Sequence, residues 1–244
     1  MIDVRDVVVE YGKRAGAVRA VDKISLRVAP GESLALIGPS GCGKSSLLFA
    51  MAGLIRPTEG AISVNGEPLN RPRREIALIL QNAGLLPWKT VWQNANLSLL
   101  LGKEYPRATA QAVLDELGLG EVKRRYPSEL SEGMKRRVGI ARALSTSPSV
   151  MLMDEPLASL DTLTKERIQD LFLRLWVRHA FALVLVTHDI EEAAFLGQRV
   201  AVLTDRPARI KEVVENRAMG EQNYRETTAF ADTVARLRAA LERE

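Results

Sequence analysis

The chain has 244 residues, of which 46% are hydrophobic, and its 34 basic and 30 acidic residues give a formal net charge of +4. This length suits one large α/β domain or two small ones, and the apolar content excludes wholesale disorder. No stretch approaches the roughly 18 apolar residues of a membrane-spanning helix, and the first residues lack the order of a secretory signal. The only cysteine, Cys42, excludes an internal disulfide, which fits a reducing cytoplasm.

The basic residues gather in three clusters, at 71–74, 123–125 and 135–137. A surface that binds nucleic acid usually interleaves aromatic residues with such clusters, and only Tyr126 lies beside one of them. We therefore interpret the clusters as solvated faces and expect no nucleic-acid partner.

Alternating apolar residues predict antiparallel strands over 2–10 and 18–28. Short apolar runs predict buried strands, and an Asn-Gly pair at 65–66 predicts a tight turn after one of them. These further strands are expected at 34–37, 61–64, 75–81, 150–153, 181–186, 200–203 and 209–214.

Helical periodicity separates the strands, which implies crossover connections and a largely parallel sheet. The helices are expected after residue 46 and at 91–101, 109–117, 134–145, 163–178, 191–195 and 230–241. We expect a helical subdomain over about 86–147 and a C-terminal extension over about 205–244, which we interpret as a helical cap. The predicted fold is α/β, a single domain over 1–244 with a mixed sheet, an N-terminal antiparallel β part and an inserted helical subdomain.

The strand at 34–37 leads into a segment that matches the pattern G-x-x-x-x-G-K-[ST] without a mismatch. The segment reads Gly38-Pro39-Ser40-Gly41-Cys42-Gly43-Lys44-Ser45-Ser46. A strand, a glycine-rich turn and a helix together direct backbone N–H groups toward a polyphosphate. Lys44 can reach the β- and γ-phosphates, and the hydroxyl of Ser45 can bind Mg²⁺. The pattern predicts a phosphate loop and the fold of a P-loop ATPase core.

Polar residues at the ends of three other buried strands are candidates for the chemistry. Asp154 and Glu155 follow 150–153, and neighbours at a strand end point in different directions. We therefore assign Asp154 to Mg²⁺ and Glu155 to the general base that activates water. His188 follows 181–186, where open α/β sheets bind ligands, and Gln81 ends 75–81, where it could orient water or bind Mg²⁺.

Taken together, these residues resemble the nucleotide-binding subunit of ATP-binding cassette (ABC) transporters, through about residues 2–204 and in the family's order. The resemblance implies that Tyr11 stacks on adenine, that Gln81 senses Mg²⁺ and contacts a membrane partner, and that His188 contacts the γ-phosphate. It also implies that Leu130-Ser131-Glu132-Gly133-Met134 is the signature that completes the site of a second copy, and that Ser159-Leu160-Asp161 crosses the dimer interface.

The signature departs from the family's usual Leu-Ser-Gly-Gly-Gln at two positions, Glu132 and Met134. Ser131 and Gly133, whose hydroxyl and N–H would meet the γ-phosphate, are kept, and Ser131 is also a good helix N-cap. Met134 cannot hydrogen-bond as glutamine does, and one lost neutral hydrogen bond costs about 0.5–1.5 kcal/mol. We predict ATPase activity that is reduced but real.

Residues 81–88 and 91–94 resemble the corresponding residues in the ABC importers of nitrate, taurine and aliphatic sulfonates. This resemblance implies an ATPase that uses ATP and Mg²⁺, pairs with itself or with a paralogous subunit, and lies on the cytoplasmic face of the inner membrane. Its partners would be a permease and, indirectly, a solute-binding protein. Three alternatives remain open: a soluble cassette protein of translation or DNA repair, a regulatory nucleotide sensor, and a GTPase or kinase, although no Asn precedes a Lys as guanine recognition requires.

Overall fold

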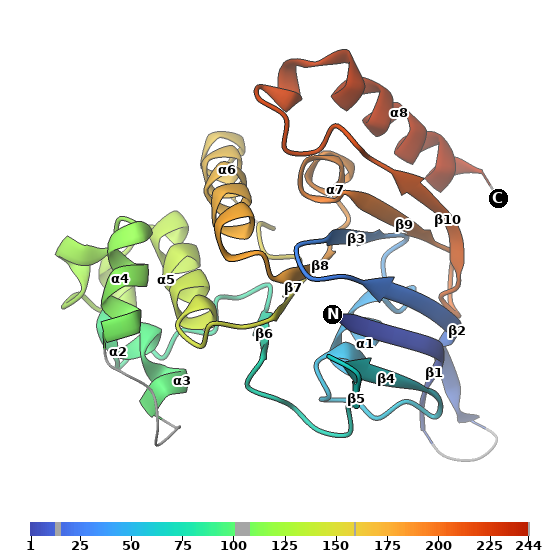
Figure 1. The fold of residues 1–244 in the computed structure, drawn as a ribbon, viewed down its shortest axis with the longest axis horizontal. Coiled ribbons are helices and arrows are strands. Elements are labelled where there is room, and N and C mark those ends of the chain that lie inside the picture. Colours follow the sequence, from blue (N-terminus) through green and yellow to red (C-terminus); the bar gives the residue numbers. More distant parts are fainter. Residues whose placement is uncertain (13–15, 101–107, 159, 244) are drawn as a thin grey trace.

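Two β-sheets form the centre of the computed structural model, which describes residues 1–12, 16–100, 108–158 and 160–243 (Figure 1). The first sheet is antiparallel, with strand order β2-β1-β4-β5. Its strands are β1 (Ile2–Tyr11), β2 (Val18–Val28), β4 (Glu59–Val64) and β5 (Glu67–Pro68). Asn65 and Gly66 both have positive φ, at 52° and 85°, and form the expected turn between β4 and β5.

The second sheet has the strand order β10-β9-β3-β8-β7-β6, and only the β10–β9 pair is antiparallel. This arrangement confirms the predicted mixed, largely parallel sheet. Its strands are β3 (Ser33–Ile37), β6 (Ile76–Ile79), β7 (Val150–Asp154), β8 (Ala182–Val186), β9 (Arg199–Leu203) and β10 (Ile210–Glu215).

The inner strands of this sheet are buried on both faces. In β7, Val150 and Leu152 pack into the core with the residues of α1 (Lys44–Met51), whereas Met151 and Met153 pack into the core on the opposite face. Side chains of a strand alternate between its faces, so both faces must be apolar when helices cover both. This explains why the strand has no polar residue before its carboxyl end.

The helices α2 (Val91–Ala95), α3 (Leu97–Leu100), α4 (Ala108–Glu116) and α5 (Glu132–Leu144) stand to one side of the sheets, and we call them the helical lobe (Figure 1). Two short 3₁₀ turns, Gly120–Val122 and Pro127–Glu129, join α4 to α5. The long helix α6 (Thr162–His179) connects β7 to β8, and the short helix α7 (Ile190–Leu196) connects β8 to β9. Among the described residues, no helix combines the length and the apolarity needed to cross a bilayer.

The prediction of one helix over 91–101 is wrong, because α2 ends at Ala95 and α3 begins at Leu97. The buried Asn96 causes the break. Its side-chain amide donates to the carbonyl oxygen of Trp92 at 2.8 Å, and its own backbone N–H donates to the same oxygen at 3.0 Å. A side chain that competes for backbone acceptors in this way favours a helix end. Residue 101 lies outside the described residues.

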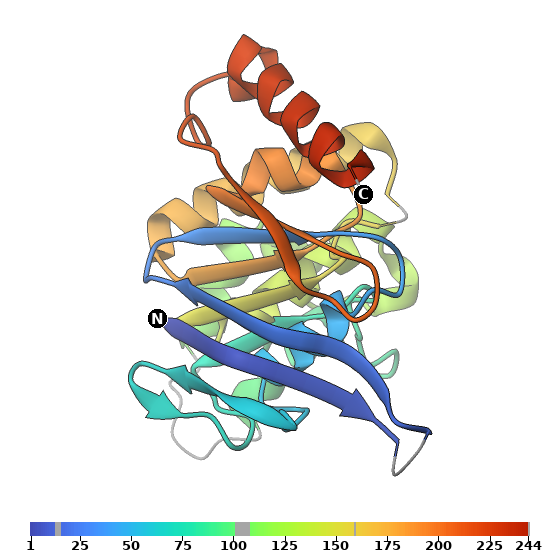
Figure 2. The same ribbon diagram turned by 90° about the vertical axis from the view of Figure 1, so that its right-hand side faces the viewer.

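The C-terminal segment ends in α8 (Thr228–Glu242), which follows a 3₁₀ turn at Tyr224–Glu226. Figure 2 shows this helix lying across the top of the molecule, on the side away from the antiparallel sheet. Leu237 and Ala240 of α8 are buried against Ala193 of α7 and Val214 of β10. The hydroxyl of the buried Tyr224 in the preceding turn donates to Oδ1 of Asn216 at 2.6 Å.

Candidate functional site

The phosphate loop connects β3 to α1 and depends on glycine at Gly43. Its φ is 130°, which side chains rarely allow, and a Cβ there would lie 2.3 Å from the carbonyl oxygen of Ala20. Gly41 also has a positive φ, 73°. The loop therefore keeps its shape only with glycine at these positions, and that shape directs the backbone N–H groups at the start of α1 into one cavity.

Lys44 is buried, and its ammonium group lies within the loop itself. Nζ donates to the carbonyl oxygens of Gly38 at 2.7 Å and of Pro39 at 2.8 Å. These are neutral acceptors, so the charge of Lys44 is not cancelled by a hydrogen-bonded carboxylate. A phosphate group that enters the loop would meet this positive charge directly.

Ser45 and Asp154 lie side by side at the end of β7. The hydroxyl of Ser45 donates to Oδ1 of Asp154 at 3.0 Å. Burial raises the pKa of Asp154, the hydrogen bond from Ser45 opposes the rise, and the neighbouring Glu155 adds to it. Two protein oxygens with room for phosphate and water oxygens fit Mg²⁺, which binds through one or two carboxylates plus substrate phosphates rather than in an all-protein cage.

Glu155 and His188 meet at the mouth of the same cavity. Oε2 of Glu155 lies 3.1 Å from Nδ1 of His188, and the backbone N–H of Glu155 donates to Val186 at 2.8 Å. Glu155 has a φ of 45°, which turns the chain away from β7 directly after Asp154. The two adjacent carboxylates therefore do face different partners, as the strand-end argument requires.

A cavity of about 550 Å³ is lined by most of these groups, whereas Asp154 does not line it and is connected to it through Ser45. Its lining includes the expected Glu155 and His188 together with one residue that the sequence analysis did not select, Arg206. The full lining is Ser40, Gly41, Gly43, Lys44, Ser45, Ser46, Glu155, His188 and Arg206. Tyr11 lies at its edge, where its hydroxyl donates to Ser46 at 3.0 Å and 45% of the residue is exposed. Cys42 is buried beneath the loop and does not line the cavity.

The structure does not bring Gln81 into this cavity. β6 ends at Ile79, so Gln81 lies two residues beyond the strand that was expected to end on it, and its side chain is exposed. Its carbonyl oxygen instead accepts a hydrogen bond from Arg136 of α5. Nη2 of Arg136 also donates to the carbonyl oxygen of Ala158 at 3.1 Å. Burial lowers the pKa of this arginine.

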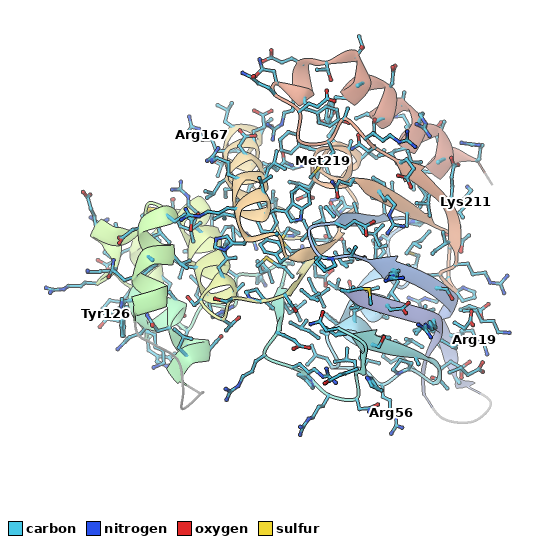
Figure 3. The ribbon with its side chains drawn as sticks, in the orientation of Figure 1. Arg19, Arg56, Tyr126, Arg167, Lys211 and Met219 are labelled. Atoms are coloured by element: carbon cyan, nitrogen blue, oxygen red, sulfur yellow. The ribbon has the colours of Figure 1, made fainter. Side chains whose placement is uncertain are left out.

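Ser131, Gly133 and Asp161 lie elsewhere, in a second cavity of about 630 Å³ between α5 and α6. Leu160 lines it too, whereas Ser159 is outside the described residues. Arg167 on α6 also lines this cavity (Figure 3). Tyr126 does not line it and lies on the outer side of the helical lobe. No described residue lines both cavities. One chain therefore presents the phosphate loop and the signature on separate surfaces.

Both signature residues that are kept have a local structural role. Ser131 caps α5, where its Oγ accepts from the N–H of Met134 at 3.3 Å, and a Cβ on Gly133 would lie 2.9 Å from Cγ2 of Thr164. Asp161 caps α6 in the same manner, accepting from the N–H of Thr164 at 3.0 Å, and this bond holds its pKa below the usual value.

The two altered signature residues point to different environments. Met134 is partly buried and packs against the large core cluster of the helical lobe. Glu132 is exposed in the first turn of α5 and forms an ion pair of 2.6 Å with Lys135. Met134 thus gains apolar contacts that a glutamine would make less well.

Glu192 in α7 is a buried carboxyl group that the sequence analysis did not select. It accepts a hydrogen bond from the hydroxyl of Thr187, its Oε1 has no hydrogen-bond partner among the described residues, and it is 2% exposed. Burial raises its pKa to about 7. Nothing in the sequence pattern distinguishes it from the exposed Glu191 beside it, because only the packing of α7 decides which of the two is buried.

Comparison with protein families matches residues 21–158 to the ABC transporter model. The aliphatic sulfonates import ATP-binding protein of Bacillus cereus is 36% identical over 216 residues, which cover 88% of this chain and 86% of the relative. The nitrate import ATP-binding protein of Synechocystis sp. is 43% identical over 203 residues, covering 82% and 76%. The taurine import ATP-binding protein of Jannaschia sp. is 40% identical over 198 residues, covering 80% and 74%.

Among solved structures, the chain is similar to a dimeric ATP-binding cassette in a post-hydrolysis state, bound to ADP and inorganic phosphate. The TM-score is 0.77 at 28% sequence identity, and the match covers 88% of this chain and 98% of that one. This similarity agrees with the arrangement of sheets and helices described above.

The raised pKa of the buried Glu192 predicts how the stability of the protein depends on pH. Its folded-state pKa of about 7 exceeds the ordinary value of 4.5, so between these values the folded protein keeps a proton that the unfolded chain loses. The free energy of unfolding must therefore fall as pH rises through this window. Glu192→Gln should remove this component, and urea unfolding at pH 5 and pH 8 measures it. The exposed Glu191→Gln is the control, and an equal pH dependence in all three proteins would contradict the assignment.

Proposed function

Because the chain belongs to the ABC transporter family, we propose that it is the ATP-hydrolysing subunit of an importer, working as a head-to-tail dimer beneath a separate membrane permease. The observation that carries the proposal is the separation of the two cavities. One holds the phosphate loop with Glu155 and His188, and the other holds Ser131 and Gly133. Neither contains both sets of groups, so a second copy must complete each site.

In the phosphate cavity, Lys44 and the backbone N–H groups of the loop would bind the β- and γ-phosphates of ATP. Ser45 and Asp154 would hold Mg²⁺, which neutralises charge that develops on the phosphates. Glu155 would accept a proton from the attacking water, and its contact of 3.1 Å with His188 keeps both side chains at the mouth of the cavity. Tyr11 would stack on adenine, because its ring is exposed beside Ser46.

At the dimer interface, Ser131 and Gly133 of one copy would reach the γ-phosphate held by the other. Both residues stand at the N-terminus of α5, which is a favourable position for an anion. Asp161, at the start of α6, lines the same cavity and would face the second copy beside them. The interface would then form only when ATP is bound and open after hydrolysis.

The permease would dock at the segment 80–90. Trp88 in this segment is 70% exposed, the largest fraction among the exposed large apolar side chains of the described residues, and Leu80 at its start is 44% exposed. The buried Asn94 fixes the segment, since its amide bonds both the N–H and the carbonyl of Leu86 and also the carbonyl of Lys89. Trp88 is thus presented on a fixed loop of the same segment as Gln81.

The import names of the similar proteins support a small solute such as a sulfonate, taurine or nitrate as cargo. The chain would lie on the cytoplasmic face of the inner membrane through the permease, and a solute-binding protein would act indirectly. We further propose that residues 1–244 function as a single ABC ATPase domain, with a helical subdomain over about 86–147 and an extension over about 205–244.

A regulatory nucleotide sensor with weak ATPase activity is the second candidate. The altered signature favours it, because Met134 packs into the core and Glu132 places a carboxylate in the first turn of α5. The retained Glu155 and His188 favour hydrolysis. A phosphate-release assay on the purified protein distinguishes the two.

Glu155→Gln tests the proposed general base. The amide cannot accept a proton, so turnover should fall by on the order of 10²–10⁴ while ATP binding stays intact. Lys44→Ala should instead lose affinity, so that Mg-ATP no longer raises the melting temperature. Phosphate release and thermal unfolding measure the two effects, with the exposed Glu121→Gln as control. Normal turnover in Glu155→Gln would remove this residue from its role.

Mixing two inactive variants tests the head-to-tail arrangement. Lys44→Ala destroys the phosphate loop, and Ser131→Arg blocks the signature. Each homodimer has two damaged sites, whereas a mixed dimer has one site that combines the intact loop of one chain with the intact signature of the other. An equimolar mixture should therefore recover phosphate release. No recovery, with mixed dimers shown by crosslinking, would contradict the shared site.

Purification from detergent-solubilised membranes tests the importer assignment. The wild-type chain should carry an integral membrane permease with it, because Trp88 and Leu80 need an apolar partner. Trp88→Ser should weaken this association without changing ATP binding. If only soluble proteins of translation or DNA repair co-purified, the importer assignment would be wrong.

A further inference from the structure

The hairpin of β9 and β10 reaches the phosphate cavity with its tip, residues 204–209. β9 ends at Leu203 and β10 begins at Ile210, so the tip is short. Arg206 is exposed, yet it lines the same cavity as Lys44 and Glu155. No role assigned so far to the phosphate loop, the signature or the strand-end carboxylates includes it.

The tip is anchored by the residues that follow Arg206. The backbone N–H of Ala208 donates to the carbonyl of Ala20 at 2.9 Å, and the N–H of Asp22 donates to the carbonyl of Ala208 at 2.9 Å. Nε of Arg209 donates to Asp22 at 2.7 Å, and the N–H of Arg209 donates to Thr204 Oγ1 at 3.0 Å. The tip is therefore bound to β2, directly beside the carbonyl of Ala20 that crowds Gly43.

Arg206 itself is bound to the phosphate loop. Its Nε and Nη2 donate to the carbonyl oxygen of Gly41 at 3.0 Å and 2.6 Å. No carboxylate pairs with it in the part of the chain that the structure describes. A guanidinium has five N–H donors and stays charged, so the bonds to one carbonyl leave donors and the full charge available.

We propose that Arg206 is a further nucleotide-binding residue, a second cation that contacts the phosphate oxygens of ATP from the hairpin tip. A triphosphate is strongly anionic, and a guanidinium matches phosphate geometry better than an ammonium does. Lys44 is tied to Gly38 and Pro39 inside the loop, whereas Arg206 is held at Gly41 on its outer side. The two charges would thus flank the phosphates. This inference rests on the proposed function, since it requires that the cavity binds ATP.

Titration of ATP and adenosine into the purified protomer, with EDTA present to prevent hydrolysis, tests the proposal. Arg206→Gln should weaken ATP binding about tenfold, the usual scale for a charge-assisted hydrogen bond, and should leave adenosine binding unchanged. Arg206→Lys should keep part of the affinity. Lys211→Gln is the matched control, because Lys211 lies on β10 of the same hairpin and does not line the cavity (Figure 3).

Unchanged ATP affinity in Arg206→Gln would overturn the proposal, and so would an equal loss of ATP and adenosine binding, which indicates a structural role. A variant that binds ATP normally but no longer forms the ATP-dependent dimer would also overturn it, because Arg206 would then pair with a carboxylate of the second copy, such as Glu132. A wild-type chain that bound no ATP even with Mg²⁺ present would remove the proposed function itself, which distinguishes the two failures.

Discussion

The hydrogen bond between Ser45 and Asp154 depends on the alignment of three parallel strands, and the rest of the site depends on that alignment. Leu36 of β3 and Asp154 of β7 both pair with Val186 of β8. The three strands therefore end in one row, and each continues at once into a functional segment. The phosphate loop follows β3, Glu155 follows β7, and His188 follows β8. A shift of one residue in the pairing of β7 with β8 would move the carboxylate to the opposite face of the sheet.

The same alignment explains why the phosphate loop and the signature line different cavities of the chain. Parallel strands gather their functional ends at one edge, and the phosphate loop, Glu155 and His188 all lie there. The helical lobe stands to the side, joined to the sheet by the segment between β6 and α2 and by the segment between α5 and β7, so Ser131 and Gly133 face a different cavity. The fold separates the groups that bind phosphate from those that would close over it, and pairing of two chains is a geometric way to unite them.

The sequence predicted the groups whose signal is local. The phosphate loop, the paired carboxylates and the positions of most strands along the chain were recognisable from short patterns, and the mixed, largely parallel sheet is confirmed. The single helix over 91–101 was wrong because the decisive feature, the hydrogen bond from Asn96 to Trp92, is a side-chain choice that periodicity does not record. Arg206 was missed for another reason: it meets Gly41 across 165 positions of sequence, and no spacing rule connects them.

Arg136 connects the helical lobe to two loops at once, which affects how a movement of the lobe would spread. One guanidinium from α5 holds the carbonyl of Gln81 and that of Ala158. The first belongs to the segment with the exposed Trp88, and the second lies between Glu155 and Asp161. A rotation of α5 would strain both hydrogen bonds together. A displacement of the segment that contains Trp88 would therefore be transmitted through Arg136 to the loop between Glu155 and Asp161. The side chain of Arg136 therefore connects the helical lobe to the segment that follows Glu155, in addition to the covalent connections of the backbone.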